Sequence, residues 1–116
     1  MESHTNQVLE ELRIATRILV NERVIDGFGH VSVRSPGDPG RYFMLRSNSG
    51  EAIAPGGYAE LTLGSEPVGE GGARPSIERF IHGEIYGTRP DVGAIVHTHS
   101  PALIPFGVSK TPLRPL

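Results

Sequence analysis

The sequence of 116 residues contains no cysteine, no long apolar run and no surplus of either charge. Without cysteine, a disulfide framework, a thiolate nucleophile and a cysteine-ligated zinc site are excluded. No apolar run approaches the length that spans a bilayer, and the polar N-terminus has no apolar signal core. The formal net charge is -2, and no basic stripe is present to neutralise phosphates. We therefore expect a soluble cytoplasmic protein with neither nucleic acid nor a membrane as partner.

The overall composition is that of an ordinary globular domain, with 37% hydrophobic and 21% charged residues. A chain of this length can bury one hydrophobic core and not two, so we expect a single domain over residues 1–116. Residues 101–116 are apolar and broken by prolines, and we expect no helix or strand there. Such an ending indicates an interrupted chain.

The expected order of elements is helix, β-hairpin, strand, helix, strand, which favours a mixed α/β sheet with helices packed on it. Residues 5–24 predict a helix capped by Thr5. Its expected buried stripe comprises Val8, Leu9, Leu12, Ala15, Ile18 and Leu19. Strands are expected at residues 29–34 and 42–46, paired as a hairpin, and at 60–63 and 92–100. The expected loops are residues 47–57 and 64–74.

A second helix is predicted to begin at residues 75–76, with Ser76 or a neighbour as its cap, and to end near Gly87. Its expected buried stripe comprises Ile77, Phe80, Ile81 and Ile85.

The strongest chemical signal is His97-Thr98-His99 in the last expected strand. Alternate side chains of a strand point to the same face, so His97 and His99 project together, with Cα atoms about 6–7 Å apart. Two imidazoles so placed can share a metal ion, at about 2.0–2.1 Å from zinc. The alternative is a pair of half-buried histidines hydrogen-bonded to the backbone.

Glu78 and His82 form a second signal, because residues four apart on a helix share a face. From the helix before the His-X-His strand, Glu78 can be a metal ligand or a general acid/base beside bound substrate. Taken alone, Glu78 is better explained as a solvated residue near a helix N-terminus, and His82 as a structural hydrogen-bonding histidine.

A third and weaker signal is the segment 27–34, in which two glycines precede a strand. Glycine permits close approach of an anionic group, for which His30, Ser32 and Arg34 are candidate substrate-binding residues. We add Ser76, at the start of the second helix, to this set. Standing alone, most Gly-X-Gly pairs are simply turns.

Together the three signals resemble the class II aldolase/adducin family in order and spacing. The matching segments are Gly29-X-Val-Ser-Val-Arg, residues 75–86 (PSIERFIHGEIY), residues 89–92 (RPDV) and residues 94–100 (AIVHTHS). The resemblance covers nearly the whole chain from about Leu9 onward. It implies a three-layer α/β/α fold with a mixed, largely antiparallel central sheet, and a homotetramer with active sites at subunit interfaces.

The resemblance also implies roles for particular residues. His97 and His99 match two of the family's three metal-binding histidines, with zinc or manganese as the expected ion, and Glu78 matches its catalytic acid/base. The third histidine lies well beyond the His-X-His strand, and this sequence ends before it. Because a catalytic zinc site takes three protein ligands and an open position, we expect this chain alone to leave the site incomplete.

Within the family, the residues favour the branch that decarboxylates hydroxylated aromatic or pyridine carboxylates. His30 stands where sugar-phosphate aldolases carry a phosphate-contacting Asn, and their Thr-Gly phosphate loop is not evident in residues 46–50. On this interpretation the metal ion acts as Lewis acid, and Glu78 or His30 protonates the carbanion left by carbon–carbon cleavage. Two alternatives stay open: an aldolase cleaving a small phosphorylated sugar, and a non-catalytic adducin-like or truncated protein.

Overall fold

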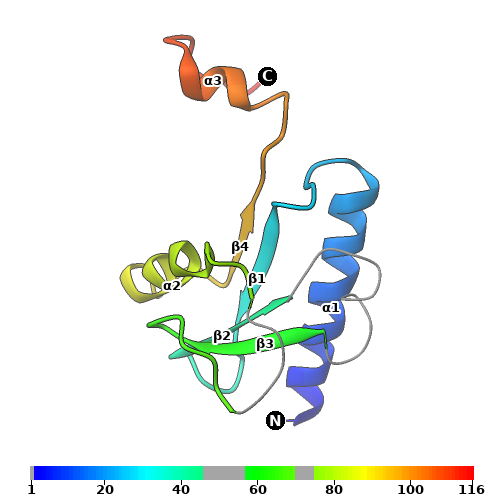
Figure 1. Cartoon of the computed structure of the whole chain (residues 1–116), viewed down its shortest axis with the longest axis vertical. Helices are drawn as coiled ribbons and strands as arrows, with labels where there is room; N and C mark the ends of the chain where they lie inside the picture. Colours follow the sequence, from blue (N-terminus) through cyan, green and yellow to red (C-terminus); the bar gives the residue numbers. More distant parts are fainter. Residues whose placement is uncertain (1, 46–56, 70–74) are drawn as a thin grey trace.

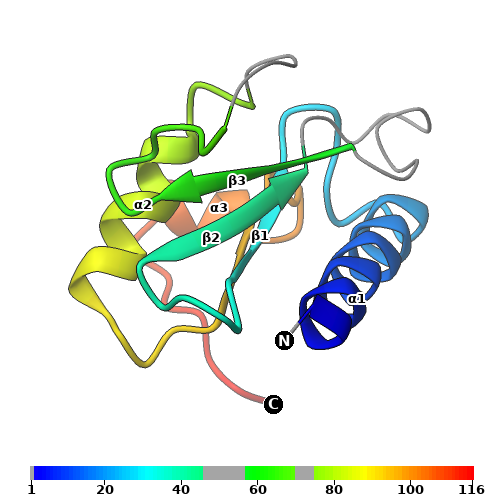
Figure 2. The ribbon, with the colours of Figure 1, turned by 90° about the horizontal axis from the view of Figure 1, so that it is seen from below.

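The computed structural model describes residues 2–45, 57–69 and 75–116, which form a four-stranded sheet and its covering helices (Figure 1). In chain order the elements are α1 (Glu2–Asn21), β1 (His30–Arg34), β2 (Arg41–Leu45), β3 (Tyr58–Thr62), α2 (Arg79–Thr88), β4 (Ala94–His97) and α3 (Ile104–Val108). The strand order is β3-β2-β1-β4, with antiparallel pairing throughout the described sheet. α1 and α2 lie on opposite faces (Figure 2). The predicted three-layer fold with a largely antiparallel sheet is confirmed.

The sheet separates two apolar clusters because side chains alternate between its faces. Val31, Phe43 and Leu45 pack with the buried side of α1. Tyr42 and Met44 alternate with Phe43 and Leu45 along β2 and pack on the opposite face, which α2 covers. The hairpin of β1 and β2 is confirmed, and the first three strands lie within two residues of their expected bounds. The expected loop 47–57 falls outside the described residues except for Gly57; of the expected loop 64–74, residues 64–69 are described and contain no helix or named strand.

α1 begins earlier than predicted and buries a narrower stripe. It extends back to Glu2, so Thr5 lies inside the helix and the prediction that it caps the helix is wrong. Leu9, Leu12 and Thr16 are buried, and the Thr16 hydroxyl donates to the Leu12 carbonyl at 2.8 Å. Ile18, expected in the stripe, is exposed. Successive residues turn by about 100° around a helix, which carries Ile18 away from the face of the buried residues.

α2 buries a different face from the one predicted. Three residues of the expected apolar stripe are exposed: Ile77, Phe80 and Ile81. The buried residues are Arg79, His82, Gly83 and Tyr86. This polar face is tolerated because it is hydrogen-bonded: within the described ranges, no buried side-chain nitrogen or oxygen lacks a partner. The buried face that hydrophobic periodicity predicted for this helix is therefore wrong.

The C-terminal part of the chain also differs from expectation. β4 covers only Ala94–His97, and the short helix α3, which the sequence did not predict, follows it. A proline in the first turn suits α3, because proline's fixed φ and missing N–H are tolerated there. Residues 101–116 are all exposed and extend away from the sheet (Figure 1). In the described ranges no helix is both long and apolar enough to cross a bilayer.

The packing of α2 on the turn after β3 gives a first prediction. A Cβ at Gly83 would collide with the Ser65 hydroxyl and lie 2.7 Å from the Leu63 carbonyl oxygen. Gly83→Ala should therefore lower the free energy of unfolding by about 1–3 kcal/mol, the usual cost of overpacking. Gly87→Ala is the matched control, since a Cβ there meets nothing within 4 Å. The control should leave stability unchanged or raise it by up to about 1 kcal/mol, because alanine is the better helix former. Equal effects of the two variants in urea unfolding would contradict this packing.

Candidate functional site

The register of β1 and β4 places two histidines directly opposite each other, His30 and His97. Opposite residues of an antiparallel pair have neighbouring side chains on the same face. The two rings stack, with centroids 4.5 Å apart and an interplanar angle of 16°. Gly29 permits this close approach, because a Cβ there would lie 2.9 Å from the His97 carbonyl oxygen.

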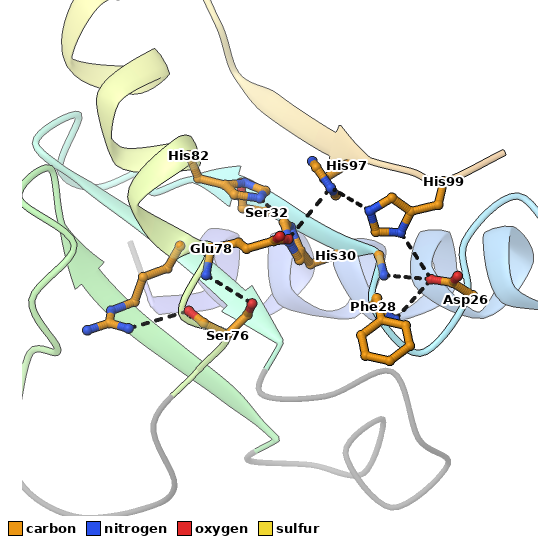
Figure 3. Close-up of polar contacts among 11 residues, drawn as sticks. Asp26, Phe28, His30, Ser32, Ser76, Glu78, His82, His97 and His99 are labelled. Atoms are coloured by element: carbon orange, nitrogen blue, oxygen red, sulfur yellow. Dashed lines mark hydrogen bonds and ion pairs between the residues drawn. The ribbon is translucent and has the colours of Figure 1, made fainter. Parts of the chain in front are cut away.

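Glu78 reaches these histidines from the turn before α2 (Figure 3). The Ser76 hydroxyl accepts the Glu78 backbone N–H at 3.1 Å and so holds this turn. Oε2 of Glu78 lies 2.8 Å from His30 Nε2 and 3.6 Å from His97 Nε2. The hydrogen bond from His30 lowers the pKa of Glu78. Glu78 is therefore an ionised carboxylate at neutral pH.

His99 approaches His97 from beyond the end of β4, with Nε2 of the two rings 3.1 Å apart. Two nitrogen ligands of a tetrahedral ion, each at about 2.0–2.1 Å, stand about 3.3 Å apart, so this spacing suits a shared ion. On its other side, His99 Nδ1 faces the Asp26 carboxylate at 3.4 Å (Figure 3). A carboxylate on the second ring nitrogen is the usual way in which a protein orients a histidine ligand.

The donor set at this point fits a divalent cation. His30, Glu78 and His97 each place a ligand atom within 4.8 Å of the others, and His99 joins through its contact with His97. Imidazole and carboxylate are ligands that zinc and manganese accept. Burial lowers the pKa of His97, which favours the neutral imidazole that binds a metal. The assignment of His97 and His99 as ligands and of Glu78 as acid/base stays a prediction.

Two of the predicted substrate-binding residues have other partners. Arg34 lies at the opposite end of β1 from His30, roughly 13 Å along the strand. Its guanidinium donates to four backbone carbonyls, those of Pro39, Tyr86, Arg89 and Val92. Ser32 is fully buried, and its hydroxyl contacts His82 and Tyr86. Substrate binding by His30, Ser32, Arg34 and Ser76 stays a prediction, and these contacts argue against it for Ser32 and Arg34.

His82 is a buried hydrogen-bonding histidine, as predicted, with Nε2 2.6 Å from His30 Nδ1. Tyr86, which continues the same helix face, was not predicted to belong to the site. The signal for both was their four-residue spacing after Glu78. Asp26 is another residue beside the site that the sequence interpretation did not single out. It accepts the N–H groups of Phe28 and Gly29, at 2.9 and 3.0 Å, and meets His99 across 73 positions of sequence, a separation that no local pattern reveals.

The fold that brings these residues together is also found in known proteins. Residues 10–116 match the family described as class II aldolase and adducin N-terminal domain, and the chain belongs to that family. Its fold resembles that of L-fuculose 1-phosphate aldolase from Glaciozyma antarctica, with a TM-score of 0.81 and 25% identity over 97% of this chain and 47% of that one.

Similar curated proteins differ in their stated reactions. The chain is 34% identical to decarboxylase tropJ of Talaromyces stipitatus, over 84% of this chain and 38% of the relative. It is 27% identical to 3,4-dihydroxyphthalate decarboxylase of Arthrobacter keyseri, over 92% of this chain and 46% of the relative. It is 37% identical to methylthioribulose-1-phosphate dehydratase of Gluconacetobacter diazotrophicus, over 64% and 35%. The chain thus spans less than half the length of these relatives.

The burial of His82 predicts how stability depends on pH. Burial, with repulsion from the other histidines, lowers its pKa from 6.5 to about 3. Between these values the unfolded chain binds the proton and the folded chain does not, so the stability contributed by neutral His82 is full above pH 6.5 and is lost as the pH falls. From pH 7 to pH 5 we expect the metal-free chain to lose about 2 kcal/mol through this residue.

Urea unfolding at the two pH values measures this loss. His82→Gln, which cannot be protonated, should lose about 2 kcal/mol less than the wild type over the same interval. Parallel losses in the two proteins would show that His82 does not resist protonation.

Proposed function

We propose that this chain forms the N-terminal part of a divalent-metal-dependent carbon–carbon lyase that decarboxylates a hydroxylated aromatic or heteroaromatic carboxylate. The observation that carries the proposal is the convergence of His97, His99 and Glu78 at the end of β4, in a chain of this family. His97 and His99 would hold zinc or manganese, together with a third ligand expected beyond residue 116. When bound, such an ion supplies a Lewis acid that stabilises negative charge developing on the substrate.

The chain's own residues supply the proton that this reaction needs. Loss of carbon dioxide leaves an electron pair on the ring carbon, and that carbon must take up a proton. Glu78 is exposed enough to meet a substrate, with 43% of its side chain accessible, and His30 Nε2 lies 2.8 Å from its carboxylate. For this step the Glu78–His30 pair first takes up a proton from solvent, and Glu78 or His30 then delivers that proton to the ring carbon as general acid; the hydrogen bond between the two residues lets the proton reach either of them.

Among the two enzyme classes, His30 favours the decarboxylase. Both its ring nitrogens already have partners, Glu78 and His82, and the residue is 5% exposed. It is poorly suited to the phosphate contact that an Asn makes at the equivalent place in sugar-phosphate aldolases. The two decarboxylases among the similar proteins support this choice. The alternative, cleavage of a small phosphorylated sugar, is supported by the likeness to L-fuculose 1-phosphate aldolase.

Mutation should separate the roles of Glu78 and His97 in a complete protein that contains this chain. Glu78→Gln should lower turnover by about 10²–10⁴-fold, the usual contribution of a general acid/base, while metal content is retained. His97→Ala should lose metal and activity together, because it removes a ligand. Carbon dioxide release and metal analysis of the purified variants measure the two effects.

The substrate panel decides between the two classes. Hydroxylated aromatic carboxylates should release carbon dioxide, and phosphorylated ketoses should be inert. Efficient aldol cleavage of a phosphorylated ketose would overturn the decarboxylase assignment and leave the metal site standing. The 116-residue chain should be inactive or nearly so toward both, and robust turnover by it would refute the need for a third ligand.

We also propose that the protein acts as a homo-oligomer, a tetramer by its family resemblance, in the cytoplasm, whose reducing environment suits a chain without cysteine. The support is the arm formed by residues 101–116, which is exposed along its whole length. Its exposed large apolar residues are Leu103, Ile104, Phe106, Val108, Leu113 and Leu116. Apolar surface gathered in this way is unusual on a monomer, so a second copy of the chain is expected to cover it.

Sedimentation of the wild type and of arm variants tests this assembly. Val108→Asp places a charge on an exposed apolar residue of the arm and should shift the protein toward monomers. Ile14→Asp makes the same change on the outer face of α1 and should leave the assembly unchanged. A compact monomeric wild type with the arm packed on its own domain would contradict the proposal.

A further inference from the structure

A line of five polar side chains runs from the candidate site into the layer between α2 and β1. Its contacts are Glu78 Oε2 to His30 Nε2 at 2.8 Å, His30 Nδ1 to His82 Nε2 at 2.6 Å, His82 Nδ1 to Ser32 Oγ at 2.6 Å, and Ser32 Oγ to the Tyr86 hydroxyl at 2.8 Å. Figure 3 shows the part nearest the site, with His82 and Ser32 behind His30. The last three members are at most 1% exposed.

The line forms because residues four apart on a helix and residues two apart on a strand recur at similar distances along the two elements. α2 and the residue before it supply members at every fourth position, Glu78, His82 and Tyr86, which lie along one face. β1 supplies His30 and Ser32 at every second position, which lie on one face of the sheet. The two rows interleave, so each member of one row contacts members of the other.

One direction of hydrogen bonding along the line fits an accepting carboxylate at its site end. An ionised carboxylate only accepts, so His30 carries a hydrogen on Nε2 and donates it to Glu78. With its single ring hydrogen on Nε2, His30 has its lone pair on Nδ1 and accepts from His82 Nε2–H. It follows that His82 Nδ1 accepts from the Ser32 hydroxyl, which in turn accepts from the Tyr86 hydroxyl.

Burial keeps the inner part of the line neutral. Desolvation lowers the pKa of His82 to about 3 and raises the pKa of Tyr86 to about 12. The neutral His82 ring has one donor and one acceptor. A hydrogen bond from the Ser32 hydroxyl to His82 Nδ1 therefore leaves the ring hydrogen on Nε2, which faces His30.

We propose that His82, Ser32 and Tyr86 are positioning residues that hold His30 in the tautomer protonated on Nε2. This tautomer makes His30 a hydrogen-bond donor in the site and prevents it from ligating the metal ion through that nitrogen, since a ligand nitrogen needs a free lone pair. His30 and His97 therefore differ in role although their rings stack. The tautomer of His30 does not depend on the proposed function. The group of a substrate that would accept its hydrogen, a carboxylate or an oxyanion, does depend on it.

NMR of the ¹⁵N-labelled chain tests the tautomer directly, because protonated and unprotonated ring nitrogens resonate far apart and can be correlated with the ring protons. In the zinc-free wild type at neutral pH, His30 and His82 should both carry their hydrogen on Nε2. Saturation with zinc should shift the ring nitrogens of His97 and His99 and leave His30 Nε2 protonated. A hydrogen on His30 Nδ1, or loss of the Nε2 hydrogen when zinc is added, would overturn the inference.

Variants of the buried partners separate positioning from simple packing. His82→Gln keeps an N–H donor for His30 Nδ1 and should preserve the tautomer, whereas His82→Leu removes it and should populate the Nδ1–H form. Ser32→Ala removes only a hydroxyl from the line and should also populate that form, by freeing His82 to turn over its own tautomer. If both disruptive variants keep His30 wholly Nε2-protonated, Glu78 alone sets the tautomer and the positioning role is refuted.

The outcome is independent of the reaction. A complete protein that fails to decarboxylate any hydroxylated aromatic carboxylate, but whose His30 keeps its hydrogen on Nε2, would refute the proposed function and support the tautomer. Decarboxylation by a protein whose His30 carries the hydrogen on Nδ1 would do the reverse.

Discussion

The pairing of β4 with β1 in one particular register is the constraint on which the site depends. A shift by one residue would put Val96 or Thr98 opposite His30 and would turn His97 to the other face of the sheet. Two features fix the register at its two ends. Near His30, Gly29 lets the strands approach closely. At the other end, Arg34 donates through its backbone N–H to Gly93 at 2.8 Å and through its guanidinium to Val92 at 2.9 Å. Arg34 therefore serves the site from a distance, by holding the strand that carries His97.

The polar face of α2 is the second feature on which the site depends. Because polar residues occupy the buried face of this helix, apolar residues are exposed on its opposite side. His82 and Tyr86 are buried with every hydrogen bond made, and a fully satisfied buried network defines one arrangement of its members more sharply than apolar contacts do. Because this face turns toward the sheet, Ile77, Phe80 and Ile81 are left exposed. The exposed apolar residues along this helix and the turn before it are thus a consequence of how the site is built.

Sequence patterns predicted the parts of this structure that local periodicity controls. The alternation in residues 29–34 identified β1, and the His-X-His spacing anticipated that His97 and His99 come together. The same logic failed for α2, because hydrophobicity alone cannot reveal that the facing strand offers Ser32 and His30 as partners. It also extended β4 through Ser100, whereas the strand ends at His97 and the position of His99 depends on residues outside the strand. The link from Asp26 to His99 comes from the tertiary fold and has no counterpart in local sequence.

On the proposed function, the choice between decarboxylation and aldol cleavage depends on the hydrogen-bonding capacity of His30 on β1. An Asn side chain offers both donors and an acceptor, and its NH₂ group can serve a phosphate that has several acceptor oxygens. An imidazole whose Nδ1 is occupied by His82 offers one donor only, and that donor already meets Glu78 at 2.8 Å. One directed donor beside a carboxylate suits a planar substrate that needs a proton delivered to one atom, and it suits a phosphate dianion poorly. On the proposed function, the buried residues that leave His30 a single way to hydrogen-bond would therefore determine specificity at this position.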